Sequence, residues 1–518
     1  MVSALGPRSG GVLLHPSSLP GPYGIGDIGP AAHAFIDWLA EAGCGLWQVL
    51  PLGPTGFGNS PYQCHSVFAG NPYLISPDFL LRDGWLRPED LRIPLYLSSN
   101  REESQTRVDY RRVITWKLSL LKTAYYRFRT TASKSSRAES EKFQTENAAW
   151  LDDFALYMAL KARNQGNSWS QWAMPLRVRE SGALSRARRQ LHEAVSFWAF
   201  GQFMFFRQWV QLRDHARMRG VRLIGDVPIF AAEDSSDVWA HPDLFSLDEA
   251  GRPTGIAGVP PDYFAPTGQL WGNPLYHWPK HLESGFSWWI ERLHAQLDLV
   301  DMVRLDHFRG LAAYWEIPAG SITAEGGRWV PGPGAIFLGE LKRALGGDHA
   351  GGGLPLIAED LGVLTPDVEK LLREFQLPGM RVLQFGLAGL QPEFLPHNYV
   401  ENCVVYTGTH DNDTSRAWFE RASAQEREFA KMYLGTRDEQ VVPAMVRAIW
   451  KSVAVFAIVP MQDLLELGAS ARMNFPGQPE GNWEWRLQEG ALSSSLAAEL
   501  RRLNTECRRL SVAAVKNS

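Results

Sequence analysis

Eight short runs of aliphatic and β-branched residues, separated by stretches with helical periodicity, constrain the fold of this chain more than any other feature. None of the runs alternates polar with apolar side chains, which is typical of strands buried on both faces of a parallel sheet. The runs are residues 11–15, 46–50, 221–229, 301–305, 354–359, 381–385, 403–407 and 453–459. Eight strands that alternate with helices predict an α/β fold, the (β/α)8 or TIM barrel.

Two of the intervening helices have clear end signals. A helix expected over residues 31–42 places Phe35 and Trp38 on one apolar stripe and ends before Gly43. Thr365 is expected to cap a second helix, which begins with Pro366.

The connections between the strands differ greatly in length. Residues 51–220 separate the second run from the third, and residues 149–161 and 191–219 within them have helical periodicity. The polar residues 130–141 predict an exposed loop. We therefore expect a mainly helical insertion, residues 86–194, on a catalytic barrel formed by residues 1–85 and 195–518. A second long connection, residues 230–278, is rich in Pro, Gly and aromatic residues and is a candidate binding loop beside the active site.

Composition excludes several classes of protein. The chain is 45% hydrophobic and 21% charged with a formal net charge of −4, so no general basic surface would recruit nucleic acid. No apolar run reaches the length of a membrane span. The four cysteines (Cys44, Cys64, Cys403 and Cys507) are scattered and form no zinc or disulfide pattern. These features predict a soluble, cytoplasmic protein.

Residues 24–29 match the G-x-G-x-x-G pattern of dinucleotide-binding folds, but the context is wrong. That fingerprint needs its glycines in a tight turn directly after a strand. Here a Pro-rich loop intervenes, Pro30 follows the third glycine, and the next strand ends without an acid to hold a ribose. The chain also lacks a Walker A sequence, an H-E-x-x-H motif and a G-x-S-x-G nucleophile elbow. We therefore expect neither a cofactor nor a metal.

Acidic residues follow or end four of the predicted strands. A single acid at such a place could simply cap the next helix, but in a barrel the C-terminal ends of the strands form one mouth. These acids are Asp226, Asp306, Glu359 with Asp360, and Asp411 with Asp413. Clustered carboxylates without histidine ligands indicate either a site for a hard cation or glycosidic chemistry. Arg304 lies two residues before Asp306, on the same face of the strand, where it can keep Asp306 ionised.

Three segments resemble the catalytic motifs of a known family. Residues 304–310 (RLDHFRG), 356–362 (LIAEDLG) and 406–414 (YTGTHDNDT) are similar to those of the amylomaltases, or disproportionating enzymes, which are 4-α-glucanotransferases of the α-amylase clan. Further segments that resemble the family are residues 60–63, 225–230, 261–264, 268–273 and 472–477. They follow the family's order from about residue 10 to residue 490.

The resemblance implies a role for each of three carboxylates. Asp306 would be the nucleophile, Glu359 the acid/base and Asp411 the stabiliser of the transition state. A desolvated setting near the other two acids should raise the pKa of Glu359, so that it holds a proton near neutral pH. The resemblance also implies that further residues bind substrate: Tyr62, Asp226, Arg304, His410, Asp262, Tyr263, Phe264, Trp271 and Asn474.

The implied activity is transfer of an α-1,4-glucan segment from a donor chain to the 4-hydroxyl of glucose or a maltooligosaccharide, by a retaining double displacement. The alternatives are an α-1,4-glucan hydrolase of the same clan, which uses water as acceptor, and an inactive glucan-binding scaffold. A scaffold would typically have lost one of the three acids, and all three are present. The implied partners are maltooligosaccharides, amylose or glycogen-derived glucans, with no nucleic acid or membrane, and the chain is expected to be a monomer or weak homo-oligomer.

The sequence departs from the family pattern in two places. Phe57 stands where relatives often have a Tyr in a second glucan-binding spot, so the hydroxyl of that spot is lost. Residues 386–389 (GLAG) lack the acids that many relatives carry near a glucose subsite, which predicts a different subsite preference. Neither departure touches the three carboxylates.

Overall fold

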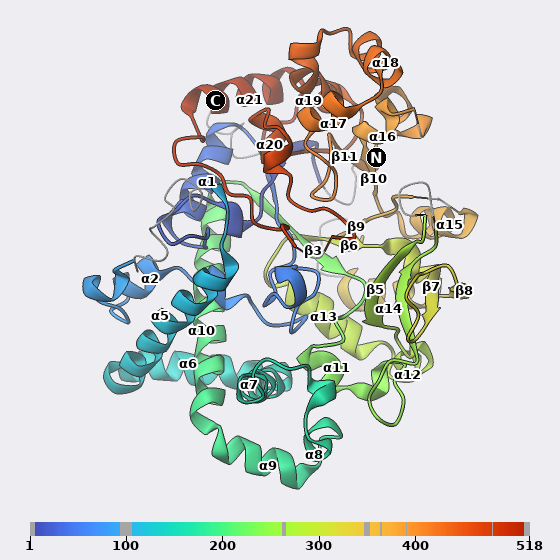
Figure 1. Cartoon of the computed structure of the whole chain (residues 1–518). Helices are drawn as coiled ribbons and strands as arrows, with labels where there is room; N and C mark the ends of the chain where they lie inside the picture. Colours follow the sequence, from blue (N-terminus) through green and yellow to red (C-terminus); the bar gives the residue numbers. More distant parts are fainter. Residues whose placement is uncertain are drawn as a thin grey trace.

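Eight parallel strands form one sheet that curves into a barrel (Figure 1). The computed structural model describes residues 6–93, 106–261, 266–346, 353–362, 365–389, 391–478 and 480–511. The strands are β1 (Ser9–Leu13), β2 (Leu46–Gln48), β3 (Arg222–Pro228), β6 (Met302–Asp306), β9 (Leu356–Ala358), β10 (Gly379–Val382), β11 (Cys403–Tyr406) and β12 (Phe456–Pro460). Their order in the sheet is β10-β11-β12-β1-β2-β3-β6-β9. The expected TIM barrel is confirmed.

The two ends of this sheet, β9 and β10, meet through a short seam. The backbone N–H of Ala358 donates to the carbonyl of Pro378 at 2.9 Å. The buried carboxylate of Asp360 accepts hydrogen bonds from the N–H of Met380 at 2.6 Å and from the Arg381 guanidinium at 3.1 Å. Asp360 was one of the acids expected at the mouth, and its contacts instead join the first and last strands of the sheet.

The prediction of the sixth strand at residues 381–385 is wrong. The strand is β10, which ends at Val382, and the short helix α16 (Leu383–Leu387) follows directly. The strand begins at Gly379, where a Cβ atom would lie 2.3 Å from Asp360, so only glycine fits there. A glycine adds nothing to the apolar pattern that marks a strand in the sequence. Apolar periodicity alone cannot separate so short a strand from the helix that continues it.

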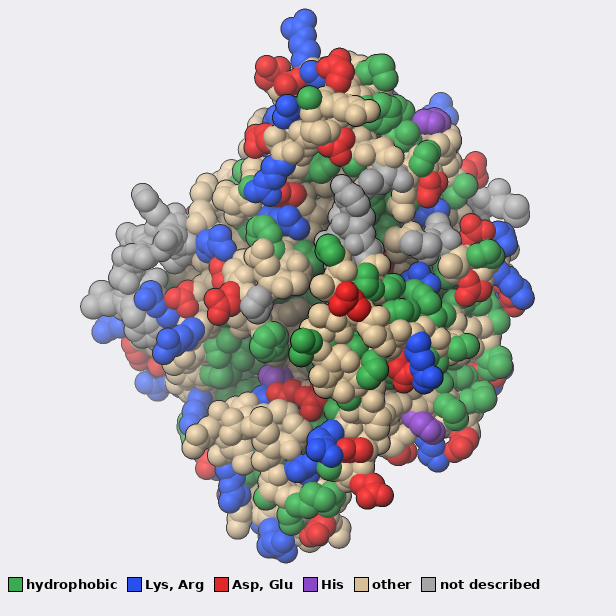
Figure 2. All heavy atoms as spheres, turned by 45° about the vertical axis from the view of Figure 1, so that its right-hand side comes forward, with side chains coloured by type: hydrophobic (Ala, Val, Ile, Leu, Met, Phe, Trp, Pro, Cys, Tyr) green, Lys and Arg blue, Asp and Glu red, His purple; other side chains and the backbone are tan. Residues whose placement is uncertain are grey.

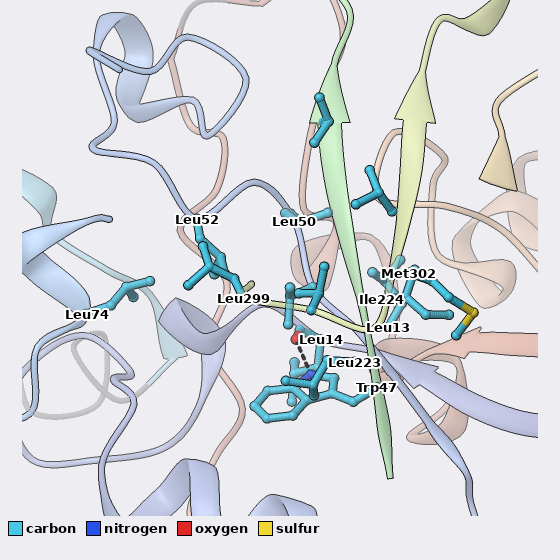
Figure 3. Packing of buried hydrophobic residues seen from close by; sticks show 14 of the residues in the cluster. Leu13, Leu14, Trp47, Leu50, Leu52, Leu74, Leu223, Ile224, Leu299 and Met302 are labelled. Carbon is cyan, nitrogen blue, oxygen red and sulfur yellow. Dashed lines mark hydrogen bonds between the residues drawn. The ribbon is translucent and has the colours of Figure 1, made fainter. Parts of the chain in front are cut away.

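Large buried apolar side chains pack around the barrel strands (Figure 3). Leu13 and Leu14 from the end of β1 pack beside Trp47 of β2 and Leu223 of β3. Trp47 is fully buried, and its indole N–H donates to the carbonyl of Leu14 at 2.7 Å, so its one polar atom is satisfied. The strands read as continuous apolar runs because both of their faces lie in such packing.

Helices surround the sheet. They are α1 (Pro30–Glu41), α2 (Pro77–Arg82), α5 (Tyr110–Thr131), α6 (Lys134–Glu146), α7 (Ala148–Arg163), α8 (Met174–Arg177), α9 (Ser181–Gln190), α10 (His192–Met218), α11 (Ser236–Ala240), α12 (Trp278–Glu283), α13 (Ser287–Leu297), α14 (Gly334–Leu345), α15 (Pro366–Phe375), α16, α17 (Ser415–Arg421), α18 (Ala424–Leu434), α19 (Val441–Lys451), α20 (Met461–Leu464) and α21 (Ser494–Glu506). Helix α1 begins and ends close to the predicted residues, and α15 begins at Pro366 as predicted, although the Thr365 hydroxyl makes no capping bond to the backbone. None of the helices among the described residues is long and apolar enough to cross a membrane.

The long connection between β2 and β3 is helical, as expected, and it includes a stretch predicted as a loop. Helix α5 continues to Thr131, and α6 begins after Ser133, whose hydroxyl caps it by accepting from the N–H of Ser136. Only Ser140 is buried in α6, so the prediction of exposure was correct and the prediction of a loop was wrong. A polar sequence can form a surface helix when a cap satisfies its first N–H groups.

A second sheet, of four antiparallel strands, was not predicted. It has the order β5-β4-β7-β8 and lies to one side of the barrel (Figure 1). Its strands are β4 (Gly255–Val259), β5 (Gln269–Pro274), β7 (Ala313–Pro318) and β8 (Arg328–Pro331). Two of them come from the connection expected to be a binding loop, where Gly and Pro obscure the alternation of a half-exposed strand.

The seam at Asp360 yields a prediction about stability. Replacing Asp360 with Ala should lower the free energy of unfolding by about 2–4 kcal/mol, because it leaves the Met380 N–H without its acceptor and the largely buried Arg381 without its carboxylate partner. Urea unfolding followed by fluorescence measures the change. The exposed Glu369→Ala variant on α15 should differ from wild type by no more than about 0.5 kcal/mol. Equal stability of the two variants would contradict a structural role for Asp360.

Candidate active site

One buried guanidinium, that of Arg304, lies between two carboxylates at the mouth of the barrel. Its Nη1 lies 2.8 Å from both carboxylate oxygens of Asp226 on β3 and 2.9 Å from Oδ1 of Asp306 on β6. The register of the two strands causes this contact, because Asp226 is paired with Arg304 and Pro228 with Asp306. Arg304 is 3% exposed, so its charge is satisfied by these acids rather than by water.

Burial dominates the protonation of Asp306. It raises the pKa of this carboxyl to about 6, an effect that Arg304 opposes and that the charges of Asp226 and Asp411 increase. The sequence predicted that Arg304 keeps Asp306 ionised. The guanidinium does favour the anion, but desolvation outweighs it, and the carboxylate is mainly ionised only above about pH 6.

Glu359 directly follows β9 and lies beside the end of β6. Its own N–H donates to the carbonyl of Leu305 at 3.0 Å. The carboxylate accepts the N–H of His307 on Oε2 at 2.8 Å and the N–H of Leu361 on Oε1 at 2.9 Å. His307 has left-handed backbone angles (φ 51°, ψ 47°), an uncommon conformation for a residue with a side chain. Two backbone groups thus fix the direction of this carboxyl group.

The pKa of Glu359 is raised to about 7, first by burial and then by the charge of Asp306. Arg304 and the two backbone N–H donors oppose this increase without cancelling it. The raised pKa of Glu359 expected from the sequence is confirmed in direction, with burial and Asp306 as its causes. Near neutral pH a proton is therefore available on Glu359 while Asp306 is largely an anion.

Asp411 has a different environment, in the loop after β11. Burial would raise its pKa, but His410 and the amide of Asn474 bring the pKa well below its usual range. His410 Nε2 lies 3.3 Å from one carboxylate oxygen, and Asn474 donates to the other at 2.6 Å. Arg472 also donates to the Asp411 carbonyl at 2.8 Å. With 46% of its side chain exposed, Asp411 faces the open part of the mouth as a permanent anion.

Aromatic rings form one wall of the site. Tyr62 donates its hydroxyl to Asp226 at 2.8 Å, and its ring is stacked on His410 at 5.1 Å between centroids. The ring centroid of Trp483 lies 5.7 Å from that of Tyr62 and 5.9 Å from that of His410. The sequence analysis missed Trp483, whose one signal is the Trp-rich stretch shortly after the last family-like segment.

Trp271, on β5 of the second sheet, reaches the same region from another direction. Its ring meets His307 edge to face at 4.8 Å, so it lies beside the residue that follows Asp306. The other members of this expected group (Asp262, Tyr263 and Phe264) lie outside the described residues. The structure therefore brings together nine of the twelve residues proposed for the site.

Phe57, expected at a second glucan spot, lies in the 3-10 turn η2 (Phe57–Asn59) with 78% of its surface exposed. Binding of glucan there stays a prediction.

Two hollows are each lined in part by residues of the site. A cavity of about 450 Å³ is lined by residues that include His15, Thr409, His410, Asp413, Arg472 and Trp485. A second cavity, of about 380 Å³, is lined by residues that include Tyr62, Asp226, Pro228, Phe230 and Arg292. Because Tyr62 and His410 are stacked on each other, the rings that separate the two hollows belong to the site itself.

The geometry favours glycosidic chemistry over the cation site that the sequence left open. A positive charge already lies between Asp226 and Asp306, because Arg304 occupies that place. Asp413 is paired with Arg421 and lies 3.8 Å from Arg472. In the part of the chain that the structure describes, no group of three or more His, Cys, Asp or Glu residues could hold a metal ion.

Comparisons with known proteins agree with this site. A family profile described as 4-alpha-glucanotransferase matches residues 14–493. The chain belongs to the 4-alpha-glucanotransferase family. A 4-alpha-glucanotransferase of Thermus thermophilus is 50% identical over 97% of this chain and 99% of its own. One of Synechocystis is 46% identical over 95% of this chain and 96% of its own.

Solved structures place the fold in the same family. An amylomaltase from Streptococcus agalactiae in complex with acarbose is 37% identical to this 4-alpha-glucanotransferase family member, with a TM-score of 0.89 over 97% of this chain and 99% of that one. The amylomaltase of Corynebacterium glutamicum, at 19% identity and a TM-score of 0.72, covers 98% of this chain and 75% of its own and shares the fold.

The two raised pKa values predict a narrow pH profile. If Asp306 attacks as an anion and Glu359 donates a proton, kcat/KM should fall below about pH 6, as Asp306 is protonated, and above about pH 7, as Glu359 loses its proton. Initial rates with maltotriose across this range provide the measurement. An α-glucosyl fluoride donor needs little acid assistance, so with it the alkaline limb should weaken while the acid limb stays. A flat profile from about pH 5 to about pH 8 would contradict these assignments.

Proposed function

We propose that this chain transfers α-1,4-glucan segments from a donor chain to the 4-hydroxyl of glucose or a maltooligosaccharide, by a retaining double displacement. The observation that carries the proposal is the pair Asp306 and Glu359. They belong to neighbouring strand ends, yet burial and charge leave the first mostly ionised and the second partly protonated near neutral pH. Membership of the 4-alpha-glucanotransferase family supplies the sugar chemistry.

In the first half-reaction Glu359 gives its proton to the glycosidic oxygen as that bond breaks. The Asp306 carboxylate attacks the anomeric carbon and forms a glycosyl ester, and the shortened glucan leaves with the proton as its new hydroxyl. The mechanism needs the two carboxyl groups about 5–5.5 Å apart, and the hydrogen bond from the Glu359 N–H to Leu305 keeps their two strand ends adjacent. Arg304 stays bound to Asp226 and orients the attacking carboxylate.

In the second half-reaction Glu359, now an anion, takes the proton from the acceptor 4-hydroxyl. The acceptor oxygen attacks the anomeric carbon, the ester bond to Asp306 breaks, and Glu359 is protonated again. Asp411 remains ionised throughout, because His410 and Asn474 hold it as an anion. It can therefore stabilise the positive charge that develops on the sugar in both transition states.

The remaining proposed residues would bind the sugar rings. Tyr62 and His410 would offer a stacked wall to a sugar ring, and Trp271, which lies next to His307, would offer a further aromatic face. For Asp262, Tyr263 and Phe264 the support is the family resemblance. Maltooligosaccharides, amylose and glycogen-derived glucans are the proposed substrates, and the acarbose complex of the Streptococcus agalactiae amylomaltase supports an oligosaccharide ligand.

Other proposals rest on composition alone. The net charge of −4 gives nucleic acid no general binding surface, and the free Cys44, Cys64, Cys403 and Cys507 fit the proposed cytoplasmic location. The absence of a membrane partner and the monomeric or weakly oligomeric state also stay predictions.

We also propose that residues 86–194 act as an insertion that supports the site. Its helix α7 contacts the loop after β3, where Asp234 accepts the hydroxyl of Tyr157 at 2.6 Å and the ammonium of Lys161 at 2.5 Å. The N–H of Trp169 donates to the same carboxylate at 3.3 Å. This loop follows the strand that carries Asp226, so the insertion would hold the Arg304 pair in place.

Maltotriose separates transfer from hydrolysis. Each transfer breaks one α-1,4 bond and makes one, so the enzyme should convert maltotriose into glucose and a series of longer maltooligosaccharides while the number of reducing ends stays nearly constant. Chromatography of the products combined with a reducing-sugar assay measures both quantities.

The folded Asp306→Asn variant is the control and should lose several orders of magnitude in turnover, because the attacking carboxylate is gone. If reducing ends instead increase in step with the loss of maltotriose, and nothing longer forms, the enzyme is a hydrolase. Near-normal turnover of Asp306→Asn would show that another group attacks the sugar.

The role of Glu359 can be tested with a donor that needs no acid. Given an α-glucosyl fluoride, the Glu359→Gln variant should still form the ester, because fluoride leaves with little acid assistance, but should resolve it slowly without a base for the acceptor. Mass spectrometry of the intact and digested protein should find one sugar adduct, on Asp306. An adduct on any other residue would refute both assignments, and the Asp360→Asn variant, altered at the adjacent acid, should not accumulate the ester.

A further inference from the structure

The antiparallel sheet beside the barrel carries an unusual row of side chains on one face. Leu270 of β5 is paired with Gly258 of β4, Gly258 with Trp315 of β7, and Trp315 with Trp329 of β8. Residues directly opposite each other in antiparallel strands point to the same face of a sheet. One row therefore crosses all four strands and presents two indoles and a leucine side chain.

The two ends of this row are open to solvent. Leu270 is 40% exposed and Trp329 is 41% exposed. Trp315 between them is partly buried, because it packs against the small cluster of Ile256, Ile317 and Ala324. The connection from β7 to β8 adds Ile322, which is 96% exposed. Figure 2 turns this side of the molecule forward and shows hydrophobic side chains exposed there among charged ones. Large aromatic and aliphatic side chains gathered on a surface often mark a binding site.

The exposed indole of Trp329 is held in a fixed orientation. The Arg309 guanidinium lies 4.0 Å from its ring centroid, and Trp315 packs against it nearly perpendicular at 5.2 Å. Trp315 is fixed in turn, because its indole N–H donates to the carbonyl of Ala324 at 2.9 Å. A ring that is already immobile loses little conformational entropy when a ligand stacks on it.

The same sheet is joined to the catalytic mouth at two points. Arg309 belongs to the turn η7 (Phe308–Leu311), which directly follows the segment of Asp306 and His307. Trp271 follows Leu270 on β5, so its side chain points to the other face of the sheet, where it contacts His307. A ligand on the row would therefore lie on the structural element that already borders the reacting carboxylates.

We propose that Leu270, Trp315 and Trp329, which we call the platform, bind a further stretch of an α-glucan chain outside the catalytic centre. This proposal rests on the proposed function. A donor or acceptor glucan is far longer than the few sugars that occupy the catalytic centre, so the rest of the chain can contact the surface outside it. The C–H faces of glucose rings can stack on an indole as other apolar surfaces do. A second attachment point raises the effective concentration of a long chain at the mouth and gives no such advantage to a short one.

Retention of the protein by amylose tests the platform without any turnover. In native gels that contain amylose, the Asp306→Asn protein should be retarded, and adding Trp329→Ala should weaken its apparent affinity about three- to tenfold. In the active enzyme, the same substitution should raise KM for amylose about three- to tenfold more than KM for maltotriose. A Trp329→Phe variant, which keeps a stacking face, should lose less.

Two controls keep the result interpretable. Met218→Ala removes an exposed apolar side chain on α10, far from the platform in the chain, and should bind amylose as the parent does. Leu270→Asn changes a second platform residue on another strand and should weaken retention in the same direction. Unfolding by urea identifies any variant that has lost its structure.

Three outcomes would overturn the proposal: unchanged retention in both Trp329→Ala and Leu270→Asn, equal increases of the two KM values, or a change in the oligomeric state caused by Trp329→Ala. The last would assign the platform to contacts between proteins. If the wild-type enzyme only hydrolyses maltotriose, the proposed function fails, but the retention of Asp306→Asn still decides whether the platform binds glucan.

Discussion

The buried ion pair network of Arg304 is the interaction on which the rest of the site depends. A guanidinium that is 3% exposed must have its charge satisfied inside the protein, and Asp226 and Asp306 do this from two neighbouring strands. The contact requires the register in which β3 and β6 pair Asp226 with Arg304. The 27-residue helix α10 leads into β3, and Tyr157 and Lys161 anchor the loop after that strand through Asp234.

Three carboxyl groups beside this network have different proton affinities. The pKa values of Asp306 and Glu359 are raised mainly by burial, and the charge of Asp306 raises the pKa of Glu359 further. Asp411 is partly open and is held as an anion by His410 and Asn474. The division of labour among the acids therefore comes from burial and hydrogen bonding, since all three side chains have the same chemistry.

Much of the fold could be read from the chain, and the failures have identifiable causes. Seven of the eight barrel strands were located because strands buried on both faces leave continuous apolar runs. The strand β10 was misplaced because its first residue, Gly379, must lack a side chain beside Asp360. The second sheet was missed because Gly in β4 and β5 and Pro at the ends of β5, β7 and β8 interrupt the apolar pattern of its strands.

The sequence by itself determined the barrel and the family, and it supplied the three carboxylates proposed as catalytic, because motifs and apolar runs are local properties of the chain. Only the tertiary structure decided which acids act together. It turned Asp360 toward the seam of the barrel and Asp226 toward Arg304, and it added Trp483 to the wall formed by Tyr62 and His410. The pKa values of the carboxyl groups were also decided by the tertiary structure, because burial and the distances between charges are set only when distant segments pack together.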